Sequence, residues 1–146
     1  MDIEGYRFLE AGYFSYDHIN DKFKFNFKGP EARQKKLSNL THIVYAHTVD
    51  GEIVYIGETS NTLHKRMYYY CNHKGATNVR VREYFKDKMY NEQIENVMQR
   101  VKTYVYQPKD IVIEGNDINP YVGLEQFLIN KINPILNKKN VMGKVI

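Results

Sequence analysis

The chain has 146 residues, of which 42% are hydrophobic, and carries 21 Lys and Arg against 17 Asp and Glu, a formal net charge of +4. This length and content predict one domain with its own core, and the charge permits a polyanionic partner. A single cysteine, Cys71, excludes an intramolecular disulfide and a cysteine-rich zinc site, and no apolar run approaches the roughly 18 residues of a membrane span. We therefore expect a cytoplasmic protein with no signal peptide, no membrane segment and no disulfide-linked partner.

Residues 1–40 form an aromatic and basic stretch whose clearest element is residues 23–28 (FKFNFK), a period-two alternation ended by Gly29 and Pro30. The alternation predicts a strand with one apolar and one cationic face. Its lysines have two interpretations: they prevent aggregation of an edge strand, or they contact phosphate groups. We expect residues 1–40 to be an N-terminal extension that packs on a domain formed by residues 41–146.

Two strand-like runs, residues 42–48 and 52–56, flank the pair Asp50-Gly51 and predict a β-hairpin. A two-residue loop at Asp50-Gly51 would scatter polar and apolar side chains over both faces of the hairpin. We therefore expect a three-residue loop over residues 49–51, with Gly51 in the left-handed conformation as a bulge.

That register places Tyr45 directly opposite Tyr55, and His47 opposite Ile53. These residues would share one face of the hairpin, which we expect to be available for chemistry. The opposite face would be core, made by Val44, Ala46, Val54 and Ile56.

Helical spacing follows the hairpin. Residues 59–61 offer caps for a first helix, a second helix is expected to begin near residue 77, and a Val/Thr alternation over residues 97–106 predicts a third strand. A last helix is predicted from Asn119-Pro120 to Asn133-Pro134. The buried stripes of the three helices would be Leu63, Met67 and Cys71; Val81, Phe85 and Met89; and Leu124, Leu128 and Ile132. The fold class is therefore α+β, with a small, mostly antiparallel three-stranded sheet flanked by helices.

The hairpin and first helix also carry a recognisable motif. Residues 43–45 (IVY) and 54–57 (VYIG) resemble the two tripeptides that name the GIY-YIG nuclease family, and residues 55–70 (YIGETSNTLHKRMYYY) continue the likeness. It covers roughly residues 41–137. The resemblance implies a GIY-YIG-like fold and a metal-dependent DNA endonuclease that hydrolyses phosphodiester bonds.

The chain departs from the family motif at two positions. Ile43 stands where the motif usually has its first glycine, and Glu58 follows Gly57 where several members carry a lysine. A lysine there would help to hold a reactive oxygen anionic, whereas Glu58 adds negative charge. Residues 76–81 (ATNVRV) and the extended N-terminus look like the restriction-enzyme branch of the family rather than its excision-repair branch.

The resemblance also implies a set of site residues. On the first helix the family carries an arginine and, one turn later, a tyrosine or histidine; a glutamate and an asparagine lie on and after a later helix. Matched onto this chain, together with the two motif tyrosines, the catalytic candidates are Tyr45, Tyr55, Arg66, Tyr70, Glu125 and Asn137. His73 is an alternative to Tyr70.

These residue types suit phosphodiester hydrolysis. The carboxylate of Glu125 is a suitable ligand for one Mg²⁺, with Mn²⁺ expected to substitute, and the five histidines show no spacing that favours zinc. Arg66 offers a planar fork to the phosphate, and Tyr70 reaches the same group. We expect Tyr45 to act as the general base, with Tyr55 orienting the water; Asn137 would fix the glutamate end of the site, which completes the candidate set.

Double-stranded DNA is the expected partner, bound by a homodimer if the target site is symmetric. The candidates for DNA contact are Lys24, Lys28, Lys35, Lys36, Arg80 and Arg82, with a solvated surface as the alternative. A sequence-specific restriction-type endonuclease is the leading interpretation. A phage or mobile-element nicking or homing endonuclease, and a non-catalytic DNA-binding protein that keeps the fold, remain alternatives.

Overall fold

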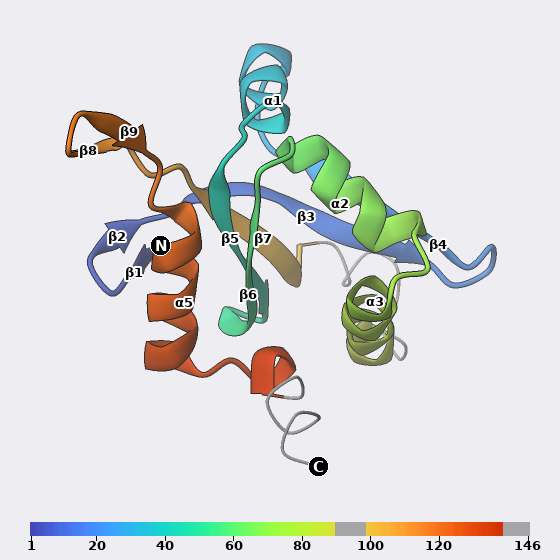
Figure 1. Cartoon of the computed structure of the whole chain (residues 1–146). Coiled ribbons are helices and arrows are strands. Elements are labelled where there is room, and N and C mark those ends of the chain that lie inside the picture. The colour runs from blue at the N-terminus through green and yellow to red at the C-terminus, as the bar shows by residue number, and fades with distance from the viewer. Residues whose placement is uncertain (90–98, 139–146) are drawn as a thin grey trace.

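The structure is a computed structural model, and it describes residues 1–89 and 99–138. Its centre is an antiparallel sheet of five strands in the order β4-β3-β7-β5-β6 (Figure 1). In that order the strands are β4 (Lys22–Phe27), β3 (Leu9–Asp17), β7 (Val101–Tyr106), β5 (Ile43–Val49) and β6 (Glu52–Thr59).

Helices cover both faces of this sheet. The helices α2 (Leu63–Asn72) and α3 (Ala76–Met89) lie on one side of β5 and β6, and α5 (Tyr121–Ile132) lies on the other (Figure 1). A short α1 (Glu31–Ser38) connects β4 to β5. Two small hairpins flank the sheet: β1 (Asp2–Ile3) with β2 (Tyr6–Arg7), and β8 (Ile111–Ile113) with β9 (Asn116–Ile118).

The α+β class is confirmed, but the expected three-stranded sheet is wrong, because β3 and β4 pair onto β7 and extend the sheet to five strands. The reason is the apolar side of β3, where Ala11 and Phe14 continue the core beyond β7. The predicted strand at residues 23–28 is confirmed as the outer strand β4. The division into residues 1–40 and 41–146 stays a prediction.

Most positions of the predicted helical stripes are buried, but Cys71 and Ile132 are only half-buried. Leu63 and Met67 are buried in α2, the three apolar positions of α3 are buried, and Leu124 and Leu128 of α5 are buried against the sheet. The cap of α2 is Thr62 rather than one of residues 59–61, and its hydroxyl accepts from the backbone N–H of Lys65 at 3.2 Å. The third strand begins at Val101; residues 97 and 98 of the predicted range lie outside the described residues.

The predicted hairpin register is wrong. Asp50 and Gly51 form a two-residue loop, with φ of 50° and 85°, and Val49 pairs with Glu52. Positive φ at both loop residues matches the right-handed twist of the flanking strands. An irregularity farther along then makes Val54 an additional residue on β6. The sequence pattern did not reveal this bulge, which lies inside the strand rather than in the loop.

As a consequence, Tyr45 lies opposite Gly57, and His47 lies opposite Tyr55. Val54 joins the tyrosines on the face towards α2 and α3, while Val44, Ala46 and Ile56 pack towards α5. The tyrosine face is itself part of the core: Tyr45, His47 and Tyr55 are 1%, 0% and 8% exposed. The expectation of one core face and one open face is therefore corrected.

Candidate functional site

Three tyrosines and an arginine converge between the hairpin and α2. The hydroxyl oxygens of Tyr45 and Tyr70 lie 2.7 Å apart, and Arg66 donates from Nε to the Tyr45 hydroxyl at 3.0 Å. Tyr55 completes the group, with its ring centroid 6.3 Å from that of Tyr70 and 6.4 Å from that of Tyr45. The structure thus brings together four of the six predicted catalytic residues.

The helix α2 sets the geometry of Arg66. One turn separates Arg66 from Tyr70, so both project from the same side of the helix, and the guanidinium carbon lies 4.1 Å from the centre of the Tyr70 ring. A second hydrogen bond runs from Nη1 of Arg66 to Oδ1 of Asn78 on α3, at 2.7 Å. Within residues 1–89 and 99–138, Arg66 forms no salt bridge with a carboxylate. It is therefore a half-buried cation available to an anionic ligand.

Gly57 makes room for this network. A Cβ atom added at Gly57 would lie 2.5 Å from the hydroxyl oxygen of Tyr45 and 2.8 Å from the ring of Tyr55. Its backbone conformation does not require glycine, since it is not among the residues with positive φ. The position therefore needs glycine for space, because the Tyr45 side chain crosses over it from the neighbouring strand.

Glu125 lies on the other side of β6, half-buried on α5. Burial raises the pKa of its carboxyl group to about 7, and the negative charge of Glu58 adds to this rise. Gln126 donates to Glu125 at 3.0 Å, but neither Glu58 nor Glu125 forms a salt bridge in the described part of the chain. The charge of Glu58 therefore acts on Glu125, and neither carboxylate has a cationic partner among the described residues.

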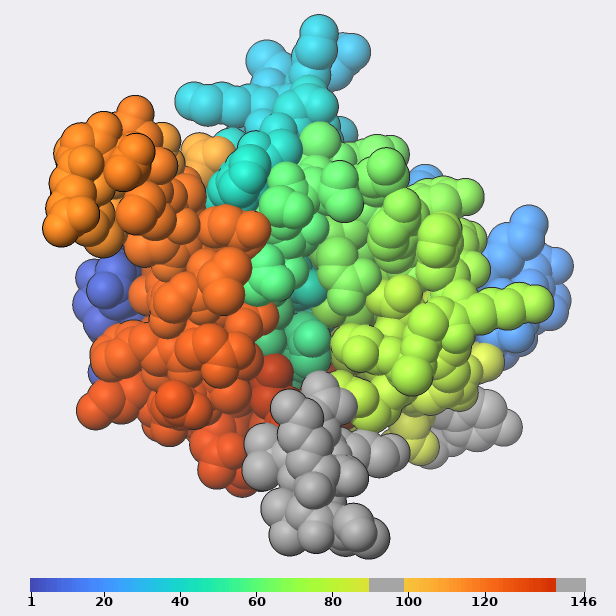
Figure 2. All heavy atoms as spheres, in the orientation of Figure 1, coloured from blue at the N-terminus to red at the C-terminus, as the bar shows by residue number. Residues whose placement is uncertain are grey.

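Tyr55 connects the two halves of the site. Burial raises the pKa of its phenol; the charge of Glu125 raises it further, whereas Arg66 lowers it. The opposite charges of Arg66 and Glu125 therefore both act on this one side chain. In Figure 2 the surface between the α5 region and the α2 and α3 region is formed by a green stripe that includes β6.

Burial dominates the acid–base behaviour of the two inner phenols. It raises the pKa of Tyr45 above its ordinary value and raises that of Tyr70 well above it. The positive charge of Arg66 opposes both shifts without reversing them. We expected Arg66 to favour the phenolate of Tyr45; in the protein alone, desolvation outweighs that effect.

Asn137 is buried and fixed, but its partner is the strand β6 rather than Glu125. Its Oδ1 accepts from the backbone N–H of Ile56, and its Nδ2 donates to the carbonyl oxygen of the same residue, both at 2.9 Å. The side chain therefore ties the segment after α5 to β6, between Tyr55 and Gly57. The expected contact with Glu125 is not among these bonds, although both residues approach the same strand.

His73, the alternative to Tyr70, lies apart from the network. It ends α2 and is exposed, and its ring stacks on Tyr69 at a centroid distance of 3.9 Å. Tyr70 is the residue that contacts Tyr45.

Two further residues lie at the site: Asn78, which the sequence analysis missed, and His47, which it placed on the tyrosine face of the hairpin but not in the catalytic set. Asn78 holds Arg66, and His47 is fully buried among the rings of Tyr45, Tyr55 and Tyr70, with Nδ1 2.8 Å from the Thr103 hydroxyl. Burial, and then the charge of Arg66, lowers the pKa of His47 well below its ordinary value. The position of His47 two residues after Tyr45 places both on one face of the strand, as predicted.

The candidates for DNA contact are spread over several elements. Lys24 is exposed on β4, Lys28 forms a salt bridge with Glu10, and Lys35 and Lys36 lie in the last turn of α1. The two arginines of α3 have backbone partners: Arg80 donates to the carbonyl of Leu136, and Arg82 to those of Tyr70 and His73. Contact of these six residues with DNA stays a prediction.

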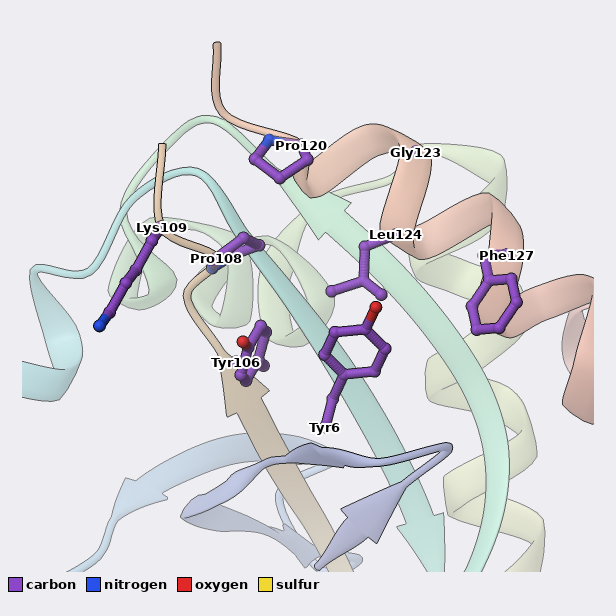
Figure 3. A pocket seen from close by; sticks show the side chains of 8 residues that line it. All are labelled: Tyr6, Tyr106, Pro108, Lys109, Pro120, Gly123, Leu124 and Phe127. Atoms are coloured by element: carbon purple, nitrogen blue, oxygen red, sulfur yellow. The ribbon is translucent and has the colours of Figure 1, made fainter. Parts of the chain in front are cut away.

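A cavity of about 480 Å³ lies elsewhere, between the N-terminal hairpin and α5 (Figure 3). None of the predicted catalytic residues lines it. Its wall consists of Tyr6, Tyr106, Pro108, Lys109, Pro120, Gly123, Leu124 and Phe127. In the described ranges, no three His, Cys, Asp or Glu side chains cluster as a metal site, and no helix has the length and apolarity needed to cross a membrane.

Comparison with known proteins shows the fold. No family model matches the sequence, and no curated protein matches it significantly. Among solved structures, a glutamate-to-alanine mutant of bacteriophage T4 EndoII is similar, with a TM-score of 0.55 and 22% identity over 89% of this chain and 91% of that one. The restriction endonuclease HPY188I in complex with product DNA has a TM-score of 0.45 and 19% identity, over 86% and 76% of the two chains. The chain thus has the fold of EndoII over most of its length.

Proposed function

We propose that this chain, which shares the fold of bacteriophage T4 EndoII, is a metal-dependent endonuclease that hydrolyses phosphodiester bonds in double-stranded DNA. The observation that carries the proposal is that Tyr55 lies between an arginine without a carboxylate partner and two glutamates without a cationic partner in the described part of the chain. Arg66 on one side lacks a carboxylate partner, and Glu58 and Glu125 on the other lack a cationic one, within the described residues. A phosphodiester accompanied by a divalent cation has the complementary charges.

The residues present fit a hard divalent cation. The half-buried carboxyl group of Glu125 resists ionisation because of burial and the charge of Glu58, so a bound cation would relieve this cost. Oxygen ligands are those that Mg²⁺ and Mn²⁺ prefer, and Glu125 would hold the ion with Glu58 as its neighbour. When bound, the ion would supply positive charge to the phosphate and the leaving oxygen.

The chain's own residues bind and orient the substrate. Arg66 binds a non-bridging phosphate oxygen through the part of its fork that Tyr45 and Asn78 leave free. Tyr55, the most exposed of the three phenols, orients the attacking water, and Tyr45 accepts its proton through the hydrogen-bonded group that includes Tyr70. Asn137 keeps β6, and with it Tyr55, in place.

The decisive experiment is cleavage of supercoiled plasmid in Mg²⁺, in Mn²⁺ and in EDTA. We expect conversion to open-circular or linear DNA in both metals and none in EDTA. Arg66→Ala should lower the rate by orders of magnitude, and Arg66→Lys should not restore it, because a point charge cannot replace the planar fork. Exposed Lys65, the neighbour of Arg66 on α2, provides the matched control as Lys65→Ala. Metal-independent cleavage, or a fully active Arg66→Lys protein, would overturn the assignment.

The same assay separates a restriction-type enzyme from its alternatives. A two-fold dimer on a symmetric site would linearise plasmid, because each subunit reaches the scissile phosphate of one strand. The similarity to a phage protein supports the alternative of a phage nicking endonuclease. A monomer that yields open-circular DNA as its final product would favour this alternative. Specific DNA binding without any cleavage would favour the non-catalytic protein.

A further inference from the structure

Asn78 holds the guanidinium of Arg66 from outside the motif that the sequence reveals. It lies in the first turn of α3, twelve positions beyond Arg66, and its Oδ1 accepts from Arg66 Nη1 at 2.7 Å. Its Nδ2 lies beside Gly75, where an added Cβ would be 3.2 Å away. The amide therefore sits against the loop that joins α2 to α3.

Only some of the N–H groups of the Arg66 guanidinium have an acceptor within the described part of the protein. A guanidinium has five N–H groups. The Nε–H donates to the Tyr45 hydroxyl and one Nη1–H donates to Asn78. The face of the guanidinium lies over the Tyr70 ring. Both Nη2–H groups and the second Nη1–H have no protein acceptor among residues 1–89 and 99–138. The two fixed bonds thus leave the terminal amino groups for a ligand.

We propose that Asn78 is a positioning residue, which sets the rotation of the Arg66 guanidinium so that Nη2 meets a non-bridging oxygen of the scissile phosphate. This inference rests on the proposed nuclease function. Tyr45 fixes one point of the guanidinium, and a planar group held at one point can still rotate about it. The bond to Asn78 supplies the second point. The arrangement is a preorganised anion site, assembled before DNA arrives.

The test is a double-mutant cycle on single-turnover DNA cleavage. Asn78→Ala should lower the cleavage rate by roughly ten- to a hundredfold, while DNA affinity changes by less than about threefold because Arg66 keeps its charge. In the Arg66→Ala background, Asn78→Ala should have no further effect. Asn72→Ala, which removes an exposed asparagine amide from α2, is the matched control and should leave the rate unchanged. Equal losses from Asn78→Ala in both backgrounds would overturn the proposal.

A second measurement needs no cleavage. In the protein without DNA, the Arg66 Nε–H should give a slowly exchanging ¹⁵N-correlated signal, which Asn78→Ala shifts and broadens and Asn78→Asp retains, because aspartate keeps the accepting oxygen. Asn78→Asp should also weaken DNA binding, since its charge competes with phosphate. An unchanged Arg66 signal in Asn78→Ala would sink the positioning role. Failure of the wild-type protein to cut DNA, with this signal behaving as expected, would instead refute the nuclease function.

Discussion

At the level of single residues, the environment of Glu125 opposes ionisation of its carboxyl group. Its pKa of about 7 results from burial and from the charge of Glu58, whereas an unfolded glutamate titrates near 4.5. Because the folded pKa is the higher one, the contribution of Glu125 to stability is present below about pH 4.5 and is lost as the pH rises through 7. The cation-binding role proposed above would account for keeping such a residue.

Glu125→Gln should therefore separate stability from activity. We expect metal-dependent cleavage to be abolished and DNA binding to be retained. At pH 8 the melting temperature should rise by roughly 2–4 °C, the size expected for about 1 kcal/mol after allowance for solvent screening, with little change at pH 5. Calorimetry in EDTA at both pH values checks this, with Glu52→Gln, an exposed carboxylate on β6, as control. A lower melting temperature at pH 8 would show that the ionised group stabilises the fold.

Tyr45→Phe removes the hydroxyl at the centre of the network and leaves Tyr70 and the Nε–H of Arg66 without their partner. Single-turnover cleavage should slow by roughly 10²-fold, and Tyr55→Phe should cost less. Exposed Tyr68 on the same helix provides the control as Tyr68→Phe.

The pH profile tests the same phenol independently. Because burial raises the pKa of Tyr45 above 10, its ionised fraction rises about tenfold per pH unit at lower pH. Between pH 7.5 and 9, above the pKa of Glu125, the logarithm of the wild-type rate should climb with a slope near one. A flat profile, or wild-type rates in Tyr45→Phe, would assign the proton to another group.

At the level of elements, the β5–β6 hairpin depends on the crossing of Tyr45 over Gly57. The bulge at Val54 shifts the register so that these two residues are paired. The large ring on β5 then occupies the space that a side chain on β6 would need. The motif glycine is thus a packing requirement of the motif tyrosine.

Gly57→Ala should consequently destabilise the protein by about 1–3 kcal/mol and also slow cleavage, because the hydroxyl of Tyr45 has to move. Gly123→Ala on α5 is the control, since a Cβ atom there meets nothing within 4 Å and alanine favours helix. Urea denaturation of both variants measures the difference. Equal stability of Gly57→Ala and wild type would show that the Tyr45 ring can yield without cost.

At the scale of the whole molecule, the interior between the sheet and α2–α3 contains a buried histidine. His47 is neutral there, and its Nε2 has no hydrogen-bond partner in the described residues. Its folded pKa lies below the unfolded value near 6.5, so the unfolded chain takes up the proton first. Stability is therefore retained above about pH 6.5 and lost as the pH falls below it.

His47→Phe should remove this acid sensitivity. The wild type should lose stability below pH 6.5 by up to about 1.4 kcal/mol per pH unit more steeply than the variant. Denaturant titrations of both proteins at pH 7, 6 and 5 compare the slopes, and the four other histidines are common to both. Parallel slopes would mean that His47 remains neutral in the unfolded chain or charges without cost in the folded one.

Much of this organisation could be predicted from local spacing. The buried stripes of α3 and α5 and the one-turn spacing of Arg66 and Tyr70 follow from helical period alone. The pairing of β3 with β7 joins residues about ninety positions apart, and nothing in the local pattern specifies it. The bulge at Val54 likewise depends on tertiary packing rather than on local sequence. It places Val54 and the tyrosines in one core cluster and breaks the strict alternation of the strand.

The candidate site likewise has members that could be predicted from the sequence and one that could not. The motif placed Tyr45, Tyr55, Arg66 and Tyr70 together, and the structure shows them in contact. Asn78 was invisible because its relation to Arg66 depends on how α3 packs on α2. The catalytic roles themselves stay predictions until the variants above are measured.

The pairing of Asn137 with Ile56 has a consequence for the protein in solution. β6 is one of the two outer strands of the sheet, and a free outer strand is a template on which a second chain can add a strand of its own. The Asn137 amide takes up both the N–H and the carbonyl of Ile56, as a neighbouring strand would. A single side chain therefore blocks edge-to-edge association beside Tyr55, and losing it would expose the protein to aggregation at the strand that carries the proposed catalytic tyrosine.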